Sequence, residues 1–125
     1  MTDNEIRLKI AELKGWTLYD PAKYNGQVFG TAPEGQFYAQ PPMWATDISA
    51  AWGLVEEMRA DGWLVIVKTW PPNHVNPISG STGTASVNLI NKAEMRVWCS
   101  ADTVARAICL VYLKLKGMSN ETKNC

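Results

Sequence analysis

The chain has 125 residues and a mass of 13.9 kDa, a size that predicts one domain with one core. Twelve lysines and arginines balance twelve aspartates and glutamates, which argues against the broad positive field with which proteins bind duplex nucleic acid. Three cysteines without CxxC spacing and a single histidine favour reduced thiols and argue against disulfides or a zinc site. We expect a single α+β domain over residues 1–117 and a flexible tail over residues 118–125.

The N-terminal residues and the hydropathy of the chain bear on its location. The segment after Met1 is amphipathic and lacks the apolar region of a signal peptide, and no apolar stretch is long enough to cross a bilayer. We therefore expect a protein of the cytosol that is not inserted in a membrane. No cofactor or metal is expected either.

The first predicted element is a helix that begins at Thr2. Thr2 and Glu5 have the spacing of a capping box, in which each side chain accepts a hydrogen bond from the backbone amide of the other residue. Apolar residues then recur at helical spacing as far as Gly15: Ile6, Ile10 and Leu13. From Trp16 to Trp44 this periodicity stops. Glycine, proline and aromatic residues there predict a long, ordered loop of the kind that is usually functional.

A second helix and a strand are predicted next. Thr46 is the expected N-cap, and Asp47 follows it where a negative charge favours the helix dipole. One face of this helix is apolar: Ile48, Ala51, Trp52, Val55 and Met58. The helix closes at Asp61, and Trp63–Trp70 is the predicted strand. Because the first five residues of this strand are apolar on both alternating faces, we expect both sides of the sheet to be covered there.

Prolines end this strand and begin an irregular loop over Pro71–Gly83. The alternating segments Thr84–Ile90 and Glu94–Cys99 predict a hairpin. A last helix is expected to begin at Ser100 as N-cap, with Asp102 in its first turn. Its main apolar stripe comprises Val104, Ile108, Val111 and Leu115.

Two further leucines, Leu110 and Leu113, lie on the opposite side of this last helix. A helix that is apolar on two sides is usually covered on two sides. We therefore expect a homo-oligomer that forms its contact through Leu110 and Leu113.

The predicted order is helix, long aromatic loop, helix, three-stranded antiparallel sheet and C-terminal helix. Short connections between strands favour the antiparallel arrangement. The fold class is α+β, with helices covering the sheet in the manner of an α/β/α sandwich.

Five short motifs in this order resemble the phage ABA sandwich domain family, which consists of small proteins of tailed phages and prophages. The motifs are Lys14–Trp16, Thr46–Trp52, Asp61–Trp63, Ser100–Thr103 and Ala107–Cys109. The resemblance covers Ile6 to about Lys116. It implies a sheet between helical layers, and it brings no activity and no catalytic residues to this chain. The Pro71–Gly83 loop is longer than the corresponding link of the family.

The sequence offers few groups for catalysis. His74 is the single histidine, and no nucleophile motif surrounds it, so a solvated loop side chain is favoured over a general base. The glycines of Gly80–Gly83 are not followed by the lysine and helix of a phosphate loop. Asp47 and Asp102 are better explained by the first turns of helices than as paired catalytic carboxylates. We expect a protein that is not an enzyme.

Tryptophan is the unusual residue of the composition, with six in the chain beside four tyrosines and two phenylalanines. Because the indole ring carries a polar group, several are expected at a surface or ligand site. Trp52 and Trp63 are assigned to the core. The predicted ligand-binding residues are those at element ends or on one strand face, with basic residues for phosphate: Trp16, Trp44, Lys68, Trp70, Arg96, Trp98 and Arg106.

Three functions remain open. The leading hypothesis is a non-catalytic phage accessory protein of the infected host's cytoplasm, which acts in counter-defence by sequestering a host-made, nucleotide-type small molecule. The first alternative is an inhibitor or adaptor that binds a host protein through an aromatic surface. The second alternative is a small hydrolase or transferase.

Overall fold

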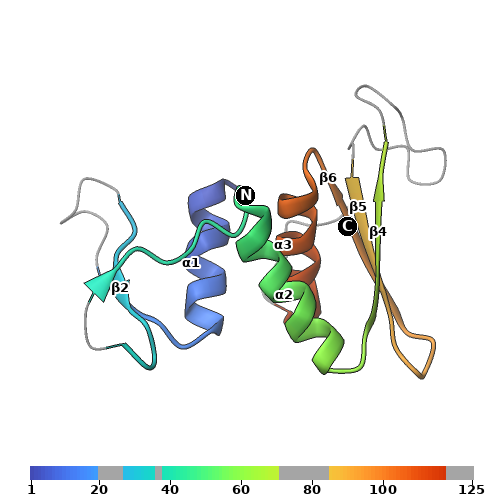
Figure 1. Cartoon of the computed structure of the whole chain (residues 1–125), viewed down its shortest axis with the longest axis horizontal. Helices are drawn as coiled ribbons and strands as arrows, with labels where there is room; N and C mark the ends of the chain where they lie inside the picture. The colour runs from blue at the N-terminus through green and yellow to red at the C-terminus, as the bar shows by residue number, and fades with distance from the viewer. Residues whose placement is uncertain (20–26, 36–37, 71–84, 118–125) are drawn as a thin grey trace.

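A computed structural model describes residues 1–19, 27–35, 38–70 and 85–117. The elements in chain order are α1 (Asp3–Leu13), β1 (Thr17–Leu18), β2 (Gly30–Thr31), β3 (Tyr38–Ala39), α2 (Ile48–Ala60), β4 (Leu64–Thr69), β5 (Ala85–Ile90), β6 (Arg96–Ala101) and α3 (Val104–Leu115) (Figure 1). The predicted α+β class, the three helices and the three-stranded antiparallel sheet are confirmed. The Pro71–Gly83 loop with His74 and Gly80–Gly83, and the predicted tail, lie outside the described residues.

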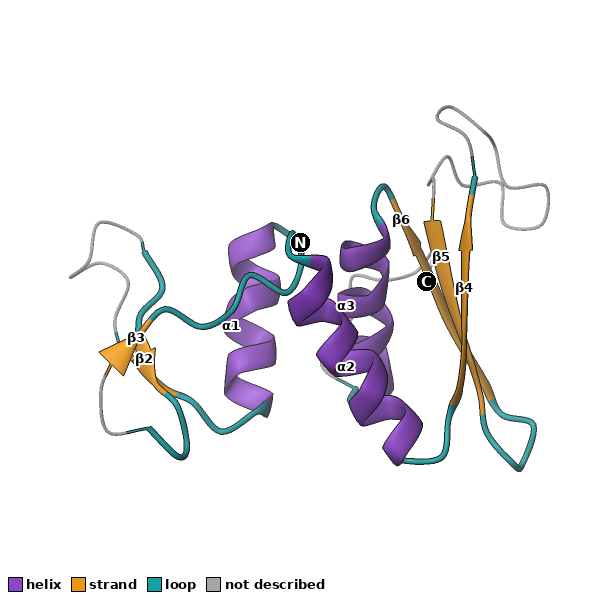
Figure 2. Ribbon diagram, in the orientation of Figure 1, coloured by secondary structure: helices purple, strands orange, loops and turns teal. Residues whose placement is uncertain are grey.

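The main sheet has the strand order β4-β5-β6, and both pairings are antiparallel. At its centre Val87 of β5 lies between Val67 of β4 and Cys99 of β6. In Figure 2 the three helices lie on one side of this sheet, and α2 passes in front of α3. Helix α3 packs on β5 and β6, α2 packs on α3 and β4, and α1 packs on α3. The last helix is therefore enclosed by its neighbours.

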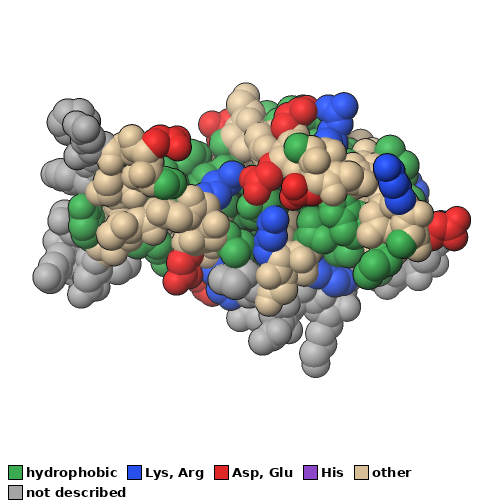
Figure 3. Space-filling model, turned by 90° about the horizontal axis from the view of Figure 1, so that it is seen from below, with side chains coloured by type: hydrophobic (Ala, Val, Ile, Leu, Met, Phe, Trp, Pro, Cys, Tyr) green, Lys and Arg blue, Asp and Glu red, His purple; other side chains and the backbone are tan. Residues whose placement is uncertain are grey.

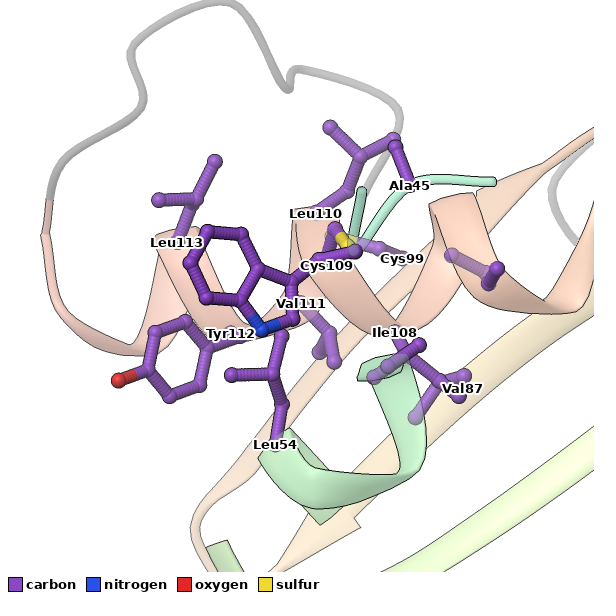
Figure 4. Close-up of a cluster of buried hydrophobic side chains, with 14 of the residues drawn as sticks. Ala45, Leu54, Val87, Cys99, Ile108, Cys109, Leu110, Val111, Tyr112 and Leu113 are labelled. Carbon is purple, nitrogen blue, oxygen red and sulfur yellow. The ribbon is translucent and has the colours of Figure 1, made fainter. Parts of the chain in front are cut away.

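Enclosure explains why α3 is apolar on more than one side. Its residues from Ala107 to Leu113 are all buried, and Figure 4 shows Ile108 beside Val87 of the sheet and Tyr112 near Leu54 of α2. Leu110 is 9% exposed and Leu113 is fully buried within a single chain. The predicted oligomer contact through Leu110 and Leu113 is therefore wrong, because other parts of the same chain cover both side chains.

Helix caps fix where the three helices begin. The predicted capping box of α1 is present, with reciprocal hydrogen bonds between Thr2 and Glu5. The N-cap of α2 is Asp47, whose carboxylate accepts from the amides of Ser49 and Ala50, and not Thr46. The N-cap of α3 is Thr103 and not Ser100, because β6 continues through Ala101 before the helix begins.

The two faces of the main sheet differ in burial. On the face toward the helices, Val87, Leu89 and Cys99 are fully buried. We call the opposite side the outer face, and alternation along the strands assigns to it Leu64, Ile66, Lys68, Ser86, Asn88, Ile90, Arg96, Trp98 and Ser100. Leu64 is 59% exposed there, and no residue of β4 is fully buried. The prediction that both sides of the strand are covered is therefore wrong at Leu64.

A second, small sheet occupies part of the segment that was predicted as a loop. Its order is β1-β2-β3, and both pairings are antiparallel. At Gly30 a side chain would not fit, since a Cβ atom would lie 2.6 Å from the carbonyl oxygen of Thr17. Two-residue strands show no alternation of apolar and polar residues, which is why the sequence pattern did not indicate them.

The described helices include none that is both long and apolar enough to cross a membrane.

Candidate functional site

Three of the predicted ligand-binding residues, Lys68, Arg96 and Trp98, lie on the outer face. Arg96 and Trp98 are neighbours on β6, whereas Lys68 lies on β4, two cross-strand rows from Arg96. Lys68 and Arg96 are exposed and Trp98 is half-buried. Trp98 lies opposite Asn88, which in turn lies opposite Ile66. The three predicted residues thus come from the two edge strands, with β5 between them.

A third cation joins this group from α3. The Nζ atom of Lys114 lies 5.8 Å from the centre of the Trp98 ring and 3.5 Å from the Trp98 carbonyl oxygen. None of the nine outer-face residues is acidic, so this face has a positive character although the whole chain is neutral. Ser86, which lies between Lys68 and Ser100, is 4% exposed, so its hydroxyl group is buried between the two edge strands.

Trp70 follows β4 directly and is half-buried, so it borders the outer face at the end of that strand. The sequence alone could place Arg96 and Trp98 on one face, because they are two residues apart in one strand. It could not place Lys68 on the same face, because that requires the register of two strand pairings.

Arg106 lies elsewhere, in a hollow of about 480 Å³ at the N-terminal ends of α2 and α3. Its guanidinium donates to the Asp3 carboxylate at 2.6 Å and to the carbonyl oxygen of Met1. Asp102 is 4.0 Å from the same guanidinium. These carboxylates offset the charge of Arg106, so the hollow is a poor site for a phosphate compared with the outer face.

Trp16 is half-buried and borders a different hollow of about 380 Å³, together with Lys14 and Glu57. Lys14 forms an ion pair with Glu57 at 2.8 Å, and the Tyr112 hydroxyl donates to the same carboxylate at 2.9 Å. Burial alone would raise the pKa of Glu57, but the hydrogen bonds from Lys14 and Tyr112 outweigh it and hold that pKa below its ordinary value. Burial and the bond to Glu57 raise the pKa of Tyr112. The network holds α1, α2 and α3 together.

Trp44 and Trp52 occupy the opposite of their predicted environments. Trp44 was predicted to bind a ligand, but it is 4% exposed and belongs to the hydrophobic core. Trp52 was assigned to the core, but it is 46% exposed. The buried side of α2 runs through Ala51, Leu54, Val55 and Met58, which leaves Trp52 and Ile48 at its margin. The sequence pattern assigned Trp52 and Ile48 to the apolar face of α2 because both are apolar. Only the packing of α3 against α2 shows which part of that face is covered.

The described cysteines show no sign of a reactive centre. Cys99 and Cys109 form no disulfide and have no exposed surface. Burial raises the pKa of Cys109 to about 12, so its nucleophilic thiolate form is negligible at neutral pH. Within residues 1–19, 27–35, 38–70 and 85–117, no three acidic, histidine or cysteine side chains cluster as metal ligands would.

The molecule outside the outer face carries both signs of charge in close proximity. Figure 3 shows basic and acidic side chains next to one another on the face seen from below. Ion pairs join Lys14 to Glu57, Arg59 to Glu56 and Lys116 to Asp61. The positive character of the outer face is therefore confined to that face.

Comparison with known proteins finds a similar fold. A 2.0 Å crystal structure of a phage protein from Bacillus cereus ATCC 14579 superposes with a TM-score of 0.67 at 19% sequence identity, over 97% of this chain and 93% of that one. No protein-family model matches this sequence, and no curated protein matches it. The likeness shows that the two chains share a fold over nearly their whole length. Membership of the ABA sandwich family stays a prediction.

Proposed function

We propose that this chain is a phage accessory protein that acts by binding and not by catalysis, and that its outer face binds a nucleotide-type small molecule. The observation that carries the proposal is that Arg96 and Trp98 are neighbours on one sheet face, with Lys114 near the Trp98 ring and Lys68 at the opposite end of the same face. The shared fold with a phage protein supports the phage source.

The chemistry of the outer face fits such a ligand. The exposed part of the half-buried Trp98 indole can stack on a base, a contact worth roughly 1–3 kcal/mol. Arg96 can donate two hydrogen bonds to a phosphate, and Lys68 adds a second charge. Among the residues that the structure describes, no carboxylate pairs with either. Asn88, beside Trp98, has both a donor and an acceptor for the edge of a base.

Sequestration follows from the same set of groups. The nine outer-face side chains include no carboxylate, thiol or imidazole that could act as a general base at neutral pH. A bound nucleotide would be held without being altered. In an infected cell this would withdraw a host-made nucleotide signal from its receptor, which is the counter-defence role.

Isothermal titration calorimetry with a panel of cyclic and linear nucleotides tests the proposal. We expect heat with at least one nucleotide and an affinity that falls as salt rises. Trp98→Ala should weaken binding by about tenfold or more, and Arg96→Ala by a similar factor. Lys92→Ala is the matched control, because Lys92 is an exposed cation of the β5–β6 turn outside the outer face. Absence of heat with every nucleotide would count against the proposal.

The alternative, an inhibitor or adaptor for a host protein, is favoured by apolar exposure at the turn end of the sheet. Leu64 is 59% and Met95 60% exposed, and Leu64 lies in the same cross-strand row as Arg96. Arginine beside apolar side chains is common where proteins bind one another. Affinity purification from host lysate tests this alternative if no nucleotide binds. Recovery of one stoichiometric host protein, and loss of that protein when Leu64→Ser is used as the bait, would support it.

A further inference from the structure

The two exposed cations of the outer face, Arg96 and Lys68, lie at its opposite ends. Arg96 belongs to the cross-strand row nearest the β5–β6 turn, whereas Lys68 lies two rows further along and on the other edge strand. Successive rows are two residues apart, about 7 Å along the strands, and the two edge strands of a three-stranded sheet are about 10 Å apart. The Cα atoms of the two cations are therefore about 17 Å apart.

This separation decides what Lys68 can contribute to a ligand. Side chains of a strand stand roughly perpendicular to the sheet, so the two charged groups stay about as far apart as their Cα atoms. At physiological ionic strength the screening length is about 8 Å, so Lys68 adds little to the binding of a phosphate that Arg96 holds. Lys68 therefore contributes only to a ligand that carries a second phosphate at the far end of the face.

The row of residues between the two cations suits bases better than phosphates. Ile66, Asn88 and Trp98 form this row, and all three are half-buried, so each presents part of its side chain to a ligand. The Trp98 ring can stack on one base, and Ile66 offers an apolar contact to another. Asn88, between them, can both donate to and accept from the edge of a base. A ligand that crosses this row should therefore place bases over it and phosphates on either side.

We propose that the ligand of the outer face is a linear oligonucleotide of two or three nucleotides, which crosses the sheet from Arg96 to Lys68. One phosphate pairs with Arg96 and another with Lys68, and the bases between them lie over the middle row. The sheets of RNA-binding domains stack roughly two or three bases on their aromatic side chains in a comparable way. This rests on the proposed function, in which Arg96 and Trp98 hold one nucleotide, and it adds the length of the ligand and the role of Lys68.

Calorimetric titration with adenosine monophosphate and with a linear triadenylate that carries a terminal phosphate tests the length of the ligand. Adenylates serve as probes because stacking on an indole accepts every base. We expect the triadenylate to bind about tenfold more tightly, since only it reaches the second cation. Lys68→Ala should abolish this gain and leave the affinity for the monophosphate unchanged, whereas Lys68→Arg should keep the gain. Lys92→Ala removes the same charge outside the outer face and should change neither affinity.

The outcomes separate this proposal from the proposed function. Equal affinity for the two adenylates, or an equal loss of both in Lys68→Ala, would overturn the extended ligand and leave nucleotide binding intact. If neither adenylate binds, the extended ligand is refuted, and the full panel of nucleotides decides the proposed function separately. Cyclic diadenylate carries its two phosphates in one ring and should bind Lys68→Ala as well as the unchanged protein. A loss of its affinity in that variant would show that both cations reach one compact ligand, which would also overturn the proposal.

Discussion

The body formed by α2, α3 and the main sheet differs in construction from the small sheet that follows α1. In the body, α3 is enclosed by strands and helices, and fully buried side chains fill the space between them. The small sheet has strands of two residues each, and Val28 is a buried side chain near it that lies outside the main core cluster.

Polar links join α1 to both regions. The buried Arg7 of α1 donates to the carbonyl oxygen of Pro41, with its Nε atom at 2.7 Å, and Lys14 reaches Glu57. Hydrogen bonds contribute less per contact than large buried apolar side chains. The body is therefore stabilised mainly by apolar burial, whereas the small sheet has close backbone approach and the packing of the partly buried Leu18 on the core. We expect the small sheet to open at a lower free energy than the body.

The largest effect is expected from Leu113→Ala in the body. Leu113 is fully buried in the core cluster, and its truncation leaves a cavity there, so the free energy of unfolding should fall by about 2–5 kcal/mol. Urea denaturation should show a lower midpoint with an unchanged slope. A loss below about 1 kcal/mol would show that α3 is not enclosed as described, and would restore the possibility of a surface role for Leu113.

Gly30→Ala should act on the small sheet alone. The added methyl would lie 2.6 Å from the Thr17 carbonyl oxygen, and relief of this contact should cost about 1–3 kcal/mol locally. Hydrogen exchange should show faster exchange of the Tyr19 amide, which bonds to Phe29, while the amides of β5 keep their protection. Gly35→Ala is the control, because its methyl would make ordinary contacts. An equal loss of protection from exchange at the amides of β5 would mean that the two regions unfold together.

The smallest effect on stability is expected from removing the ion pair of Glu57 with Lys14. The pKa of Glu57 is lower in the folded chain than its ordinary value, so the ion pair stabilises the fold at neutral pH and loses this contribution as the pH falls through the folded pKa. Glu57→Gln should therefore lower the free energy of unfolding by about 1–2 kcal/mol near pH 7. Thermal unfolding from pH 7 to pH 3 should show the two proteins converging in acid. A difference in stability between the two proteins that grows as the pH falls would contradict the predicted direction.

Much of the fold could be predicted where local chemistry decides it. The capping box of Thr2 and Glu5 begins α1, and the alternation around Asn91 gives the β5–β6 hairpin. The amphipathic pattern shows that a helix is buried but not which neighbour buries it. Leu110 was therefore assigned to a contact between chains although α3 lies inside one chain.

The candidate site was predictable in part for the same reason. Strand periodicity is enough to put Arg96 and Trp98 on one face, but Lys68 joins them only through the pairings of β5 with both its neighbours. In the sequence Trp44 and Trp52 cannot be told apart, because both carry the same indole ring with one polar group. Their burial depends on where α3 lies against α2, which no local pattern encodes.

The enclosed position of α3 also bears on how the chain folds during synthesis. The ion pair of Arg106 with Asp3 joins residues 103 positions apart, and α1 has α3 as its main packing partner. At a synthesis rate of about 5–20 residues per second, α1 waits about 5–20 seconds for that partner. Throughout that interval its apolar face is open to chaperones, so this first helix is where we expect the nascent chain to need their protection most.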